Sequence, residues 1–305
     1  MLDRMAVIDV RNLRKSYGDQ EAVRDVSFRV EPGEIFGILG PNGAGKTTTV
    51  ECLAGLRHHD GGRIRVLGLD PERYRDQLRQ VVGIQLQESQ LPANIQVDEA
   101  LELYSSFYRD PADWRALRDT LGLGPKRHTR FGKLSGGQQQ RLSIALALVG
   151  NPRIAILDEL STGLDPAARR ETWDLIESIR ERGVTIVLVT HFMPEAEHLC
   201  DRVAVIDAGR VVALDSPAGL VTRVHAEQRL RFYLSVDLDD RLLTDLPEVT
   251  AVTRQGRQVL VSGTGDVLAA VMSVLARAGV VAEQLRIEQT GLDEAFIALT
   301  GQEIS

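Results

Sequence analysis

Short apolar runs and turn residues alternate at the beginning of the chain. Between residue 6 and about residue 30, the segments AVIDV and VSFRV are separated by polar turn residues, which predicts antiparallel strands. The next run, EIFGILG (34–40), predicts a buried strand that leads through a glycine turn into a helix. We expect this helix to extend from about Lys46 to Leu53 and to be closed by Gly55.

From about residue 87 to residue 150 the apolar positions recur with a helical period, and after residue 150 strands and helices alternate again. VDEALELYSSFY (97–108), DPADWRALRDTLG (110–122) and QQQRLSIALALV (138–149) predict a helical subdomain over about 87–150. IAILD (154–158) and VTIVLVT (184–190) predict strands, joined by a helix that Asp165 caps, Pro166 opens and Gly183 ends. RVAVIDAGRVVALD (202–215) predicts a hairpin. Strands alternating with helices predict an α/β domain with a mostly parallel sheet over residues 1–220.

The pattern changes again near residues 216–224. Downstream, RLRFYLSVD, VTAVTRQG, RQVLVSG and VVAEQLRIEQ predict strands, and DRLLTDL and DVLAAVMSVLARAG predict helices. The resulting order is βαββαβ, followed by a short terminal helix in LDEAFIALTG. This order predicts a small α+β accessory domain of ferredoxin-like type over residues 221–305.

Composition narrows the function classes. With 43% hydrophobic and 26% charged residues, the 305-residue chain has the composition of a soluble globular protein. Its formal net charge of -7 argues against a general nucleic-acid binder. Apolar runs are too short to span a membrane, and the stretch MLDRMAVIDVRN lacks a signal core. Two cysteines, Cys52 and Cys200, fit a reducing cytosol and offer no metal-site spacing. We therefore expect a cytoplasmic protein.

A phosphate-binding loop is predicted between the strand at 34–40 and the helix that follows it. GPNGAGKT matches the pattern G-x-x-x-x-G-K-[ST] without a mismatch and in the context that the pattern requires. Its glycines let backbone N–H groups surround phosphate oxygens, and the helix N-terminus adds positive partial charge. Lys46 supplies a charge for the β- and γ-phosphates, and the Thr47 hydroxyl reaches Mg²⁺. The predicted nucleotide-binding residues are Gly40, Pro41, Asn42, Gly43, Ala44, Gly45, Lys46, Thr47 and Thr48.

Two adjacent acids end the strand in ILDELSTGLDP (156–166). Adjacent buried carboxylates repel each other and lose their hydration. Either the strand simply ends with both acids in solvent, or a bound cation offsets the repulsion between them. Beside a phosphate loop, Asp158 is expected to hold Mg²⁺. Because side chains alternate along a strand, Glu159 points elsewhere and is expected to polarise the attacking water.

A second candidate phosphate site lies in LSGGQQQR (134–141). A hydroxyl and two glycines precede an amphipathic helix, which is either a plain capped helix or an anion site. One nucleotide rarely needs two such sites on one subunit, so we infer that this loop binds the γ-phosphate of a nucleotide held by a second subunit. The residues concerned are Leu134, Ser135, Gly136, Gly137 and Gln138.

Taken in order, these motifs resemble the ATP-binding cassette (ABC) ATPases over essentially all of residues 6–220. The resemblance implies a P-loop nucleotide-binding domain with a RecA-like core, an antiparallel β subdomain and a helical subdomain. LSGGQ matches the family signature, which clamps ATP across a head-to-tail dimer. Tyr17 matches the aromatic that stacks on adenine, and His191 the histidine that contacts the γ-phosphate.

Three further positions follow from the same resemblance. Gln87 matches the glutamine that touches Mg²⁺ and the attacking water, although Gln85 and Gln90 leave other registers open. Asp165 matches the loop that signals between subunits, and it is also a plain helix cap. Leu160 departs from the family, which commonly has proline there; a proline would fix φ and remove an N–H group.

The branch of the family is indicated by the end of the chain. TGLDEAFIALTG (290–301) resembles the ending of bacterial drug- and antibiotic-export ATPases. The resemblance implies a motor subunit that binds ATP and Mg²⁺, forms a dimer with a second ATPase subunit, and drives separate integral membrane permease subunits from the cytoplasmic face of the membrane. In the family, the segment after Gln87 docks the membrane partner.

Two alternatives to this prediction stay open. One is the ATPase subunit of an importer. The other is a soluble cassette ATPase that acts on ribosomes or DNA, but the single signature motif, the lack of a heptad insertion and the negative charge speak against it and against a nucleic-acid partner.

Overall fold

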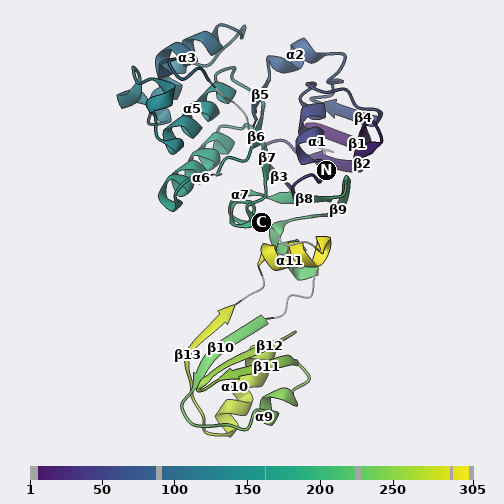
Figure 1. Ribbon diagram of the computed structural model, residues 1–305, viewed down its shortest axis with the longest axis vertical. Helices are drawn as coiled ribbons and strands as arrows, with labels where there is room; N and C mark the ends of the chain where they lie inside the picture. Colours follow the sequence, from purple (N-terminus) through teal and green to yellow (C-terminus); the bar gives the residue numbers. More distant parts are fainter. Residues whose placement is uncertain (1–5, 87–90, 162, 224–227, 289–290, 302–305) are drawn as a thin grey trace. The chain divides into compact units, whose positions relative to one another are not determined.

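The computed structural model describes residues 6–86, 91–161, 163–223, 228–288 and 291–301 (Figure 1). The chain divides into two compact units, Met1–Pro217 and Ala218–Glu303. Each unit has its own sheet and is described separately below.

The first unit is built on one mixed sheet, whose strands lie in the order β4-β1-β2-β9-β8-β3-β7-β6-β5 among the described residues. β3 pairs in parallel with β7 and β8, and β6 pairs in parallel with β5 and β7. β1 pairs antiparallel with β2 and β4, as the alternating pattern near the start of the chain predicts. The strands are β1 (Ile8–Tyr17), β2 (Gln20–Val30), β3 (Ile35–Leu39), β4 (Gly61–Val66), β5 (Val82–Gln85), β6 (Ile154–Asp158), β7 (Thr185–Thr190), β8 (Arg202–Asp207) and β9 (Arg210–Asp215).

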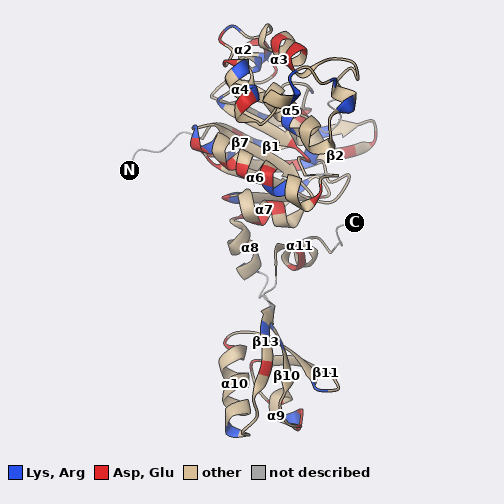
Figure 2. Cartoon of the chain, turned by 90° about the vertical axis from the view of Figure 1, so that its left-hand side faces the viewer, with Lys and Arg blue, Asp and Glu red and all other residues tan. Residues whose placement is uncertain are grey.

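The helices of this unit fall into two groups. α3 (Val97–Ser105), α4 (Trp114–Thr120) and α5 (Gly136–Leu148) pack together as the predicted helical subdomain. Figure 1 shows α3 and α5 on the β5 side of the sheet, away from β1, β2 and β4. The others are α1 (Lys46–Leu53), α2 (Arg75–Arg79), α6 (Pro166–Glu181) and α7 (Met193–Leu199). Basic and acidic residues are interspersed along α6, so this helix presents a mixed charged surface (Figure 2).

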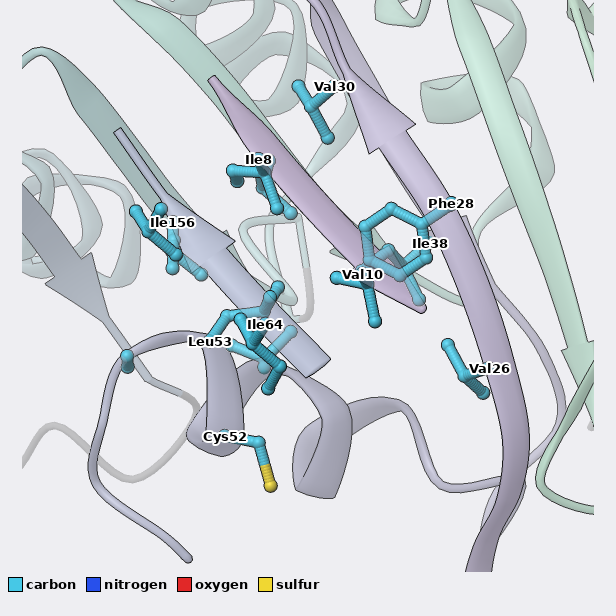
Figure 3. Packing of buried hydrophobic residues seen from close by; sticks show 14 of the residues in the cluster. Ile8, Val10, Val26, Phe28, Val30, Ile38, Cys52, Leu53, Ile64 and Ile156 are labelled. Atoms are coloured by element: carbon cyan, nitrogen blue, oxygen red, sulfur yellow. The ribbon is translucent and has the colours of Figure 1, made fainter. Parts of the chain in front are cut away.

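A continuous apolar core joins the antiparallel strands to the parallel ones. Ile8, Val10 and Phe28 belong to the same buried cluster as Leu53 of α1 and Ile156 of β6 (Figure 3). Burial of this surface supplies the main driving force for assembling the unit. The core therefore fixes α1, and with it the loop that precedes α1, against the ends of the parallel strands.

The helical subdomain is attached to the sheet by a close backbone approach. A Cβ atom added at Gly83 of β5 would lie 1.9 Å from the carbonyl oxygen of Ala147 on α5. We therefore expect Gly83→Ala to lower the free energy of unfolding by about 1–3 kcal/mol, because one of the two backbones must move. Gly61→Ala is the matched control, since its Cβ would make only ordinary contacts, at 3.5 Å, with the Arg14 side chain. Thermal unfolding of both variants measures the difference, and equal melting temperatures would contradict the prediction.

The second unit carries a four-stranded antiparallel sheet in the order β11-β12-β10-β13. With one helix after the first strand and one after the third, this is the predicted ferredoxin-like arrangement. Its core packs α10 against the inner face of the sheet through residues such as Phe232, Val261 and Val271. The elements are β10 (Gln228–Leu234), α9 (Arg241–Thr244), β11 (Val249–Gln255), β12 (Gln258–Gly263), α10 (Val267–Arg277) and β13 (Ala282–Glu288), with α8 (Pro217–Arg223) before them and α11 (Leu292–Thr300) after them.

Candidate active site

The loop Gly40–Thr47 connects β3 to α1, in the context that its pattern requires. Gly45, the residue before α1, has φ 99°, a conformation that side-chain-bearing residues rarely adopt. A Cβ atom there would also lie 2.4 Å from the carbonyl oxygen of Ala22. The loop geometry therefore requires glycine at this position. Asn42, Gly43 and Thr47 are exposed, so the loop faces outward from the end of the sheet.

Lys46 is the first residue of α1 and is only 5% exposed. Its Nζ donates hydrogen bonds to the carbonyl oxygens of Gly40 (2.8 Å) and Pro41 (3.0 Å). Burial lowers the pKa of the Lys46 ammonium, and the nearby carboxylates of Glu159 and Asp158 act in the opposite direction. The loop thus holds a positive charge near Asp158, the last residue of β6, and Glu159, which follows it.

The two acids lie at the same edge of the sheet as the loop. β3, β7, β6 and β5 are consecutive and parallel, so their carboxyl ends lie side by side. Asp158, the last residue of β6, is 1% exposed, and its Oδ2 has no hydrogen-bond partner among the described residues. Burial, together with the negative charge of Glu159, raises the pKa of the Asp158 carboxyl to about 6, although Lys46 lowers it.

Glu159 is held beside β7 and near His191. Its N–H donates to the carbonyl oxygen of Val189 (2.8 Å), and its Oε1 lies 3.1 Å from the Nδ1 of His191. The two acids therefore occupy different surroundings, one buried beside Lys46 and one paired with a histidine.

The backbone conformation of Glu159 explains why leucine, and not the proline common in the family, follows it. Its φ of 51° is in the left-handed region. A residue before proline is driven toward extended backbone, so Leu160 is compatible with this conformation where proline would oppose it. Leu160 is fully buried, so its side chain also contributes to the core.

Of the three glutamines at and after the end of β5, the structure describes only Gln85. Gln85, the last residue of β5, accepts a hydrogen bond from the Asp158 N–H (3.2 Å) and donates one to the carbonyl oxygen of Leu86 (3.1 Å). Both side-chain groups of Gln85 thus hold the end of the sheet together. Gln87, the predicted site residue, and Gln90 lie outside the described residues.

Tyr17 ends β1, and its side chain is exposed at 42%. The Cζ of Arg57 lies 5.2 Å, and the Nζ of Lys15 5.7 Å, from the centroid of its ring. A partly exposed aromatic side chain can stack on another planar ring, and the two cations add positive charge beside it.

The remaining predicted residues lie on other helix N-termini. Ser135 caps α5: its Oγ accepts from the Gln138 N–H (3.3 Å), and its own N–H donates to Gln138 Oε1 (3.1 Å). Asp165 caps α6 by accepting from the N–H groups of Ala167 (2.9 Å) and Ala168 (3.0 Å), which lower the pKa of its carboxyl.

Among the described residues, no hydrogen bond or ion pair joins 134–138 to the loop at 40–48. Leu134 is buried, and Gly136 and Gly137 begin α5.

A buried acid near the site is not predicted from the sequence. Glu195 on α7 is 0% exposed, although the sequence MPEAEH does not distinguish it from Glu197. The available signal is helical spacing, since Met193, Ala196 and Leu199 form the apolar face of α7 and Glu195 lies beside it.

The burial of Asp158 leads to a prediction about stability. The pKa of its carboxyl is about 6 in the folded protein and about 3.9 in an unfolded chain. The ionised group therefore destabilises the metal-free fold above pH 6, and this cost disappears as the pH falls below about 4. We expect Asp158→Asn to stabilise the protein by ~3 kcal/mol at pH 8 in EDTA, and by less at pH 5. Melting temperatures at the two pH values test this; a gain that does not shrink at pH 5 would contradict it.

The fold, together with the residues gathered around the phosphate loop, defines the class of protein. A glycine-rich phosphate loop between a parallel strand and a helix, with acids at the end of a neighbouring strand, is the arrangement of P-loop nucleoside triphosphatases. The antiparallel strands and the helical subdomain that are attached to this core specify the family within that class. The chain belongs to the ABC transporter family, as an ATP-binding subunit and ATPase, and the family model for ABC transporters matches residues 23–162.

Curated relatives support the family over most of the chain. The chain is 36% identical to Nod factor export ATP-binding protein I of Rhizobium etli, over 98% of this chain and 95% of that protein. It is 45% identical to the protein of the same name from Burkholderia orbicola, over 71% of this chain and 73% of the relative.

Solved structures show the same cassette fold. An ATP-binding subunit of an ABC transporter matches with a TM-score of 0.65 and 26% identity, over 71% of this chain and 92% of that one. A bacterial Atm1-family ABC exporter with ATP bound matches with a TM-score of 0.64 and 27% identity, over 73% of this chain and 40% of that one. No helix within the described part of the chain is both long enough and apolar enough to cross a membrane.

Proposed function

We propose that this chain is the motor subunit of an ABC exporter, working as a homodimer that binds two ATP molecules head to tail. The separation of its two phosphate sites supports the dimer. The phosphate loop lies at the edge of the sheet, whereas Ser135 and Gln138 begin α5 without a hydrogen bond to that loop among the described residues. A nucleotide on the loop therefore needs a second copy to supply the signature residues.

In this proposal the residues divide the work of hydrolysis. Lys46 exchanges its bonds to Gly40 and Pro41 for phosphate oxygens, and Glu159 polarises the attacking water while His191 orients it. Tyr17 stacks on adenine, and Gln87 completes the site from the segment after β5. Asp165, at the start of α6, faces the partner subunit and relays its state.

The residues present fit a magnesium ion. Mg²⁺ prefers oxygen ligands and is usually held by one or two carboxylates together with phosphates. The Asp158 Oδ2 is a buried carboxylate oxygen without a partner among the described residues, and the exposed Thr47 hydroxyl is at the start of α1. When bound, the ion neutralises charge on the β- and γ-phosphates.

Export is the direction that the comparisons favour. The curated relatives are named for Nod factor export, and one structural neighbour is an exporter. The ending 290–301 supports the drug- and antibiotic-export branch, with α11 as its helical part. Both lines support export. In this proposal the chain works at the cytoplasmic face of the membrane, bound to permease subunits.

Transport direction can be tested in vesicles. The tagged chain is first purified in mild detergent, and the multi-span protein that accompanies it is identified. Inside-out vesicles containing both proteins are then given Mg-ATP, with purified Nod factor and ethidium as separate probes. ATP-driven accumulation that Glu159→Gln abolishes supports export. Accumulation only in right-side-out vesicles that enclose Mg-ATP would indicate an importer, and recovery of ribosomes or DNA in place of a membrane protein would refute the proposal.

A further inference from the structure

A buried polar cluster connects the segment after the two acids to the helix after His191. The hydroxyl of Ser161 donates a hydrogen bond to Oε1 of Glu195, which is 0% exposed. The indole Nε1 of Trp173 on α6 lies 3.2 Å from the same carboxylate oxygen and 3.3 Å from Ser161 Oγ. One carboxylate oxygen thus joins three separate segments of the chain.

The second oxygen of this carboxylate takes no part in these contacts. Glu195 Oε2 is buried and has no hydrogen-bond partner among the described residues. A carboxylate buried in this way costs more free energy than an apolar side chain would. Packing alone therefore does not account for an acid at this position, whereas a requirement for a strong acceptor at Oε1 does.

A second set of contacts, made by Arg169 of α6, reaches the same two segments. The guanidinium carbon of Arg169 on α6 lies 4.2 Å from the ring centroid of Phe192, the residue after His191. An amino group of Arg169 donates to the carbonyl oxygen of Leu164 (3.3 Å), in the turn between the acids and α6. The rings of Phe192 and Trp173 are 6.5 Å apart.

Both contacts act on the same pair of segments. Ser161 is two residues after Glu159, and Phe192 and Glu195 are one and four residues after His191. Between these segments lie the contacts of Glu159 itself, from its Oε1 to His191 Nδ1 and from its N–H to Val189. A shift of α7 relative to 159–161 would therefore change the distance between the carboxylate and the imidazole.

We propose that Glu195, Ser161 and Trp173, together with Arg169 and Phe192, form a positioning cluster that holds Glu159 and His191 at their working separation. The left-handed φ of 51° at Glu159 supports this role, because such a conformation in a residue other than glycine persists where its surroundings enforce it. Glu195 is a positioning residue: it acts on the reaction through Ser161 and α7.

The test compares turnover with binding in the full-length chain. We expect Glu195→Ala and Ser161→Ala each to lower the kcat for ATP hydrolysis about 10- to 100-fold, with the Kd for ATP unchanged within about twofold. Glu195→Gln keeps an oxygen acceptor and should restore most of the kcat. The double variant Ser161→Ala/Glu195→Ala should be no slower than the slower single variant, because both remove one contact. Glu197→Ala, an exposed position on the same helix, is the matched control and should turn over normally.

Trp173→Phe keeps the aromatic packing and removes only the N–H group, so it tests the proposal even if Glu195→Ala fails to fold. We expect it to lower kcat by a smaller factor, with an unchanged Kd. The proposal would be overturned by wild-type kcat in all these variants. It would also be overturned by a parallel fall of kcat, ATP affinity and melting temperature that Glu195→Gln does not rescue, since that result marks a structural role alone.

Discussion

Glu159→Gln is expected to reduce ATP turnover at least about 100-fold while leaving ATP binding intact. A positioned general base contributes roughly this factor or more to a hydrolysis rate. Glutamine has the size of glutamate and can keep a hydrogen bond to His191, whose Nδ1 lies 3.1 Å from Oε1. It cannot accept a proton from water at neutral pH. The substitution also removes the charge that repels Asp158, so Mg-ATP binding should not weaken.

The measurement is ATP hydrolysis under saturating Mg-ATP, with size-exclusion chromatography of the same samples. We expect the variant to accumulate as an ATP-bound dimer, because the proposed dimer opens after hydrolysis. Glu177→Gln, an exposed position on α6, makes the same chemical change away from the site and should behave like the wild type. A Glu159→Gln variant that hydrolyses ATP at the wild-type rate would show that another group activates the water.

The fold could be predicted largely because the decisive signals are local. The helix after the phosphate loop spans Lys46–Leu53 as its glycines and apolar positions indicate, and α6 begins after Asp165. The ferredoxin-like order of the second unit also follows from its strand and helix patterns. Some short elements escaped prediction, among them β5 with four residues and α7 with seven, because so few residues give only a weak period.

The candidate site shows where sequence reasoning ends. The adjacency of Lys46, Asp158 and Glu159 could be expected, because parallel strands bring their carboxyl ends together. The burial of Glu195 could not, since it depends on α6 and Ser161 converging on one side chain. The same holds for the left-handed backbone at Glu159, which accounts for Leu160 only once φ is known.

Lys46→Met is expected to act at the opposite step and to weaken ATP binding about 100-fold. A hydrogen bond from a charged donor contributes about 1.5–3 kcal/mol, and a loss of 2.7 kcal/mol corresponds to ~100-fold in Kd. Lys46 is buried with its Nζ on two loop carbonyl oxygens, so the loop already holds this charge before a nucleotide arrives. Methionine keeps the apolar stem and removes the charge, so the loop should stay folded. The Kd follows from calorimetric titration with Mg-ATP, and Lys126→Met, at an exposed position, is the control.

The two variants separate binding from chemistry when compared side by side. Lys46→Met should fail to form the ATP-dependent dimer at ATP concentrations that saturate the wild type, whereas Glu159→Gln should form it and keep it. This opposition is expected from their positions, since Lys46 lies on the loop that is proposed to hold the phosphates and Glu159 lies beside His191. An unchanged Kd in Lys46→Met would mean that the loop at 40–48 is not the nucleotide site. A dimer that forms equally in both variants would mean that closure does not depend on the phosphates that this loop holds.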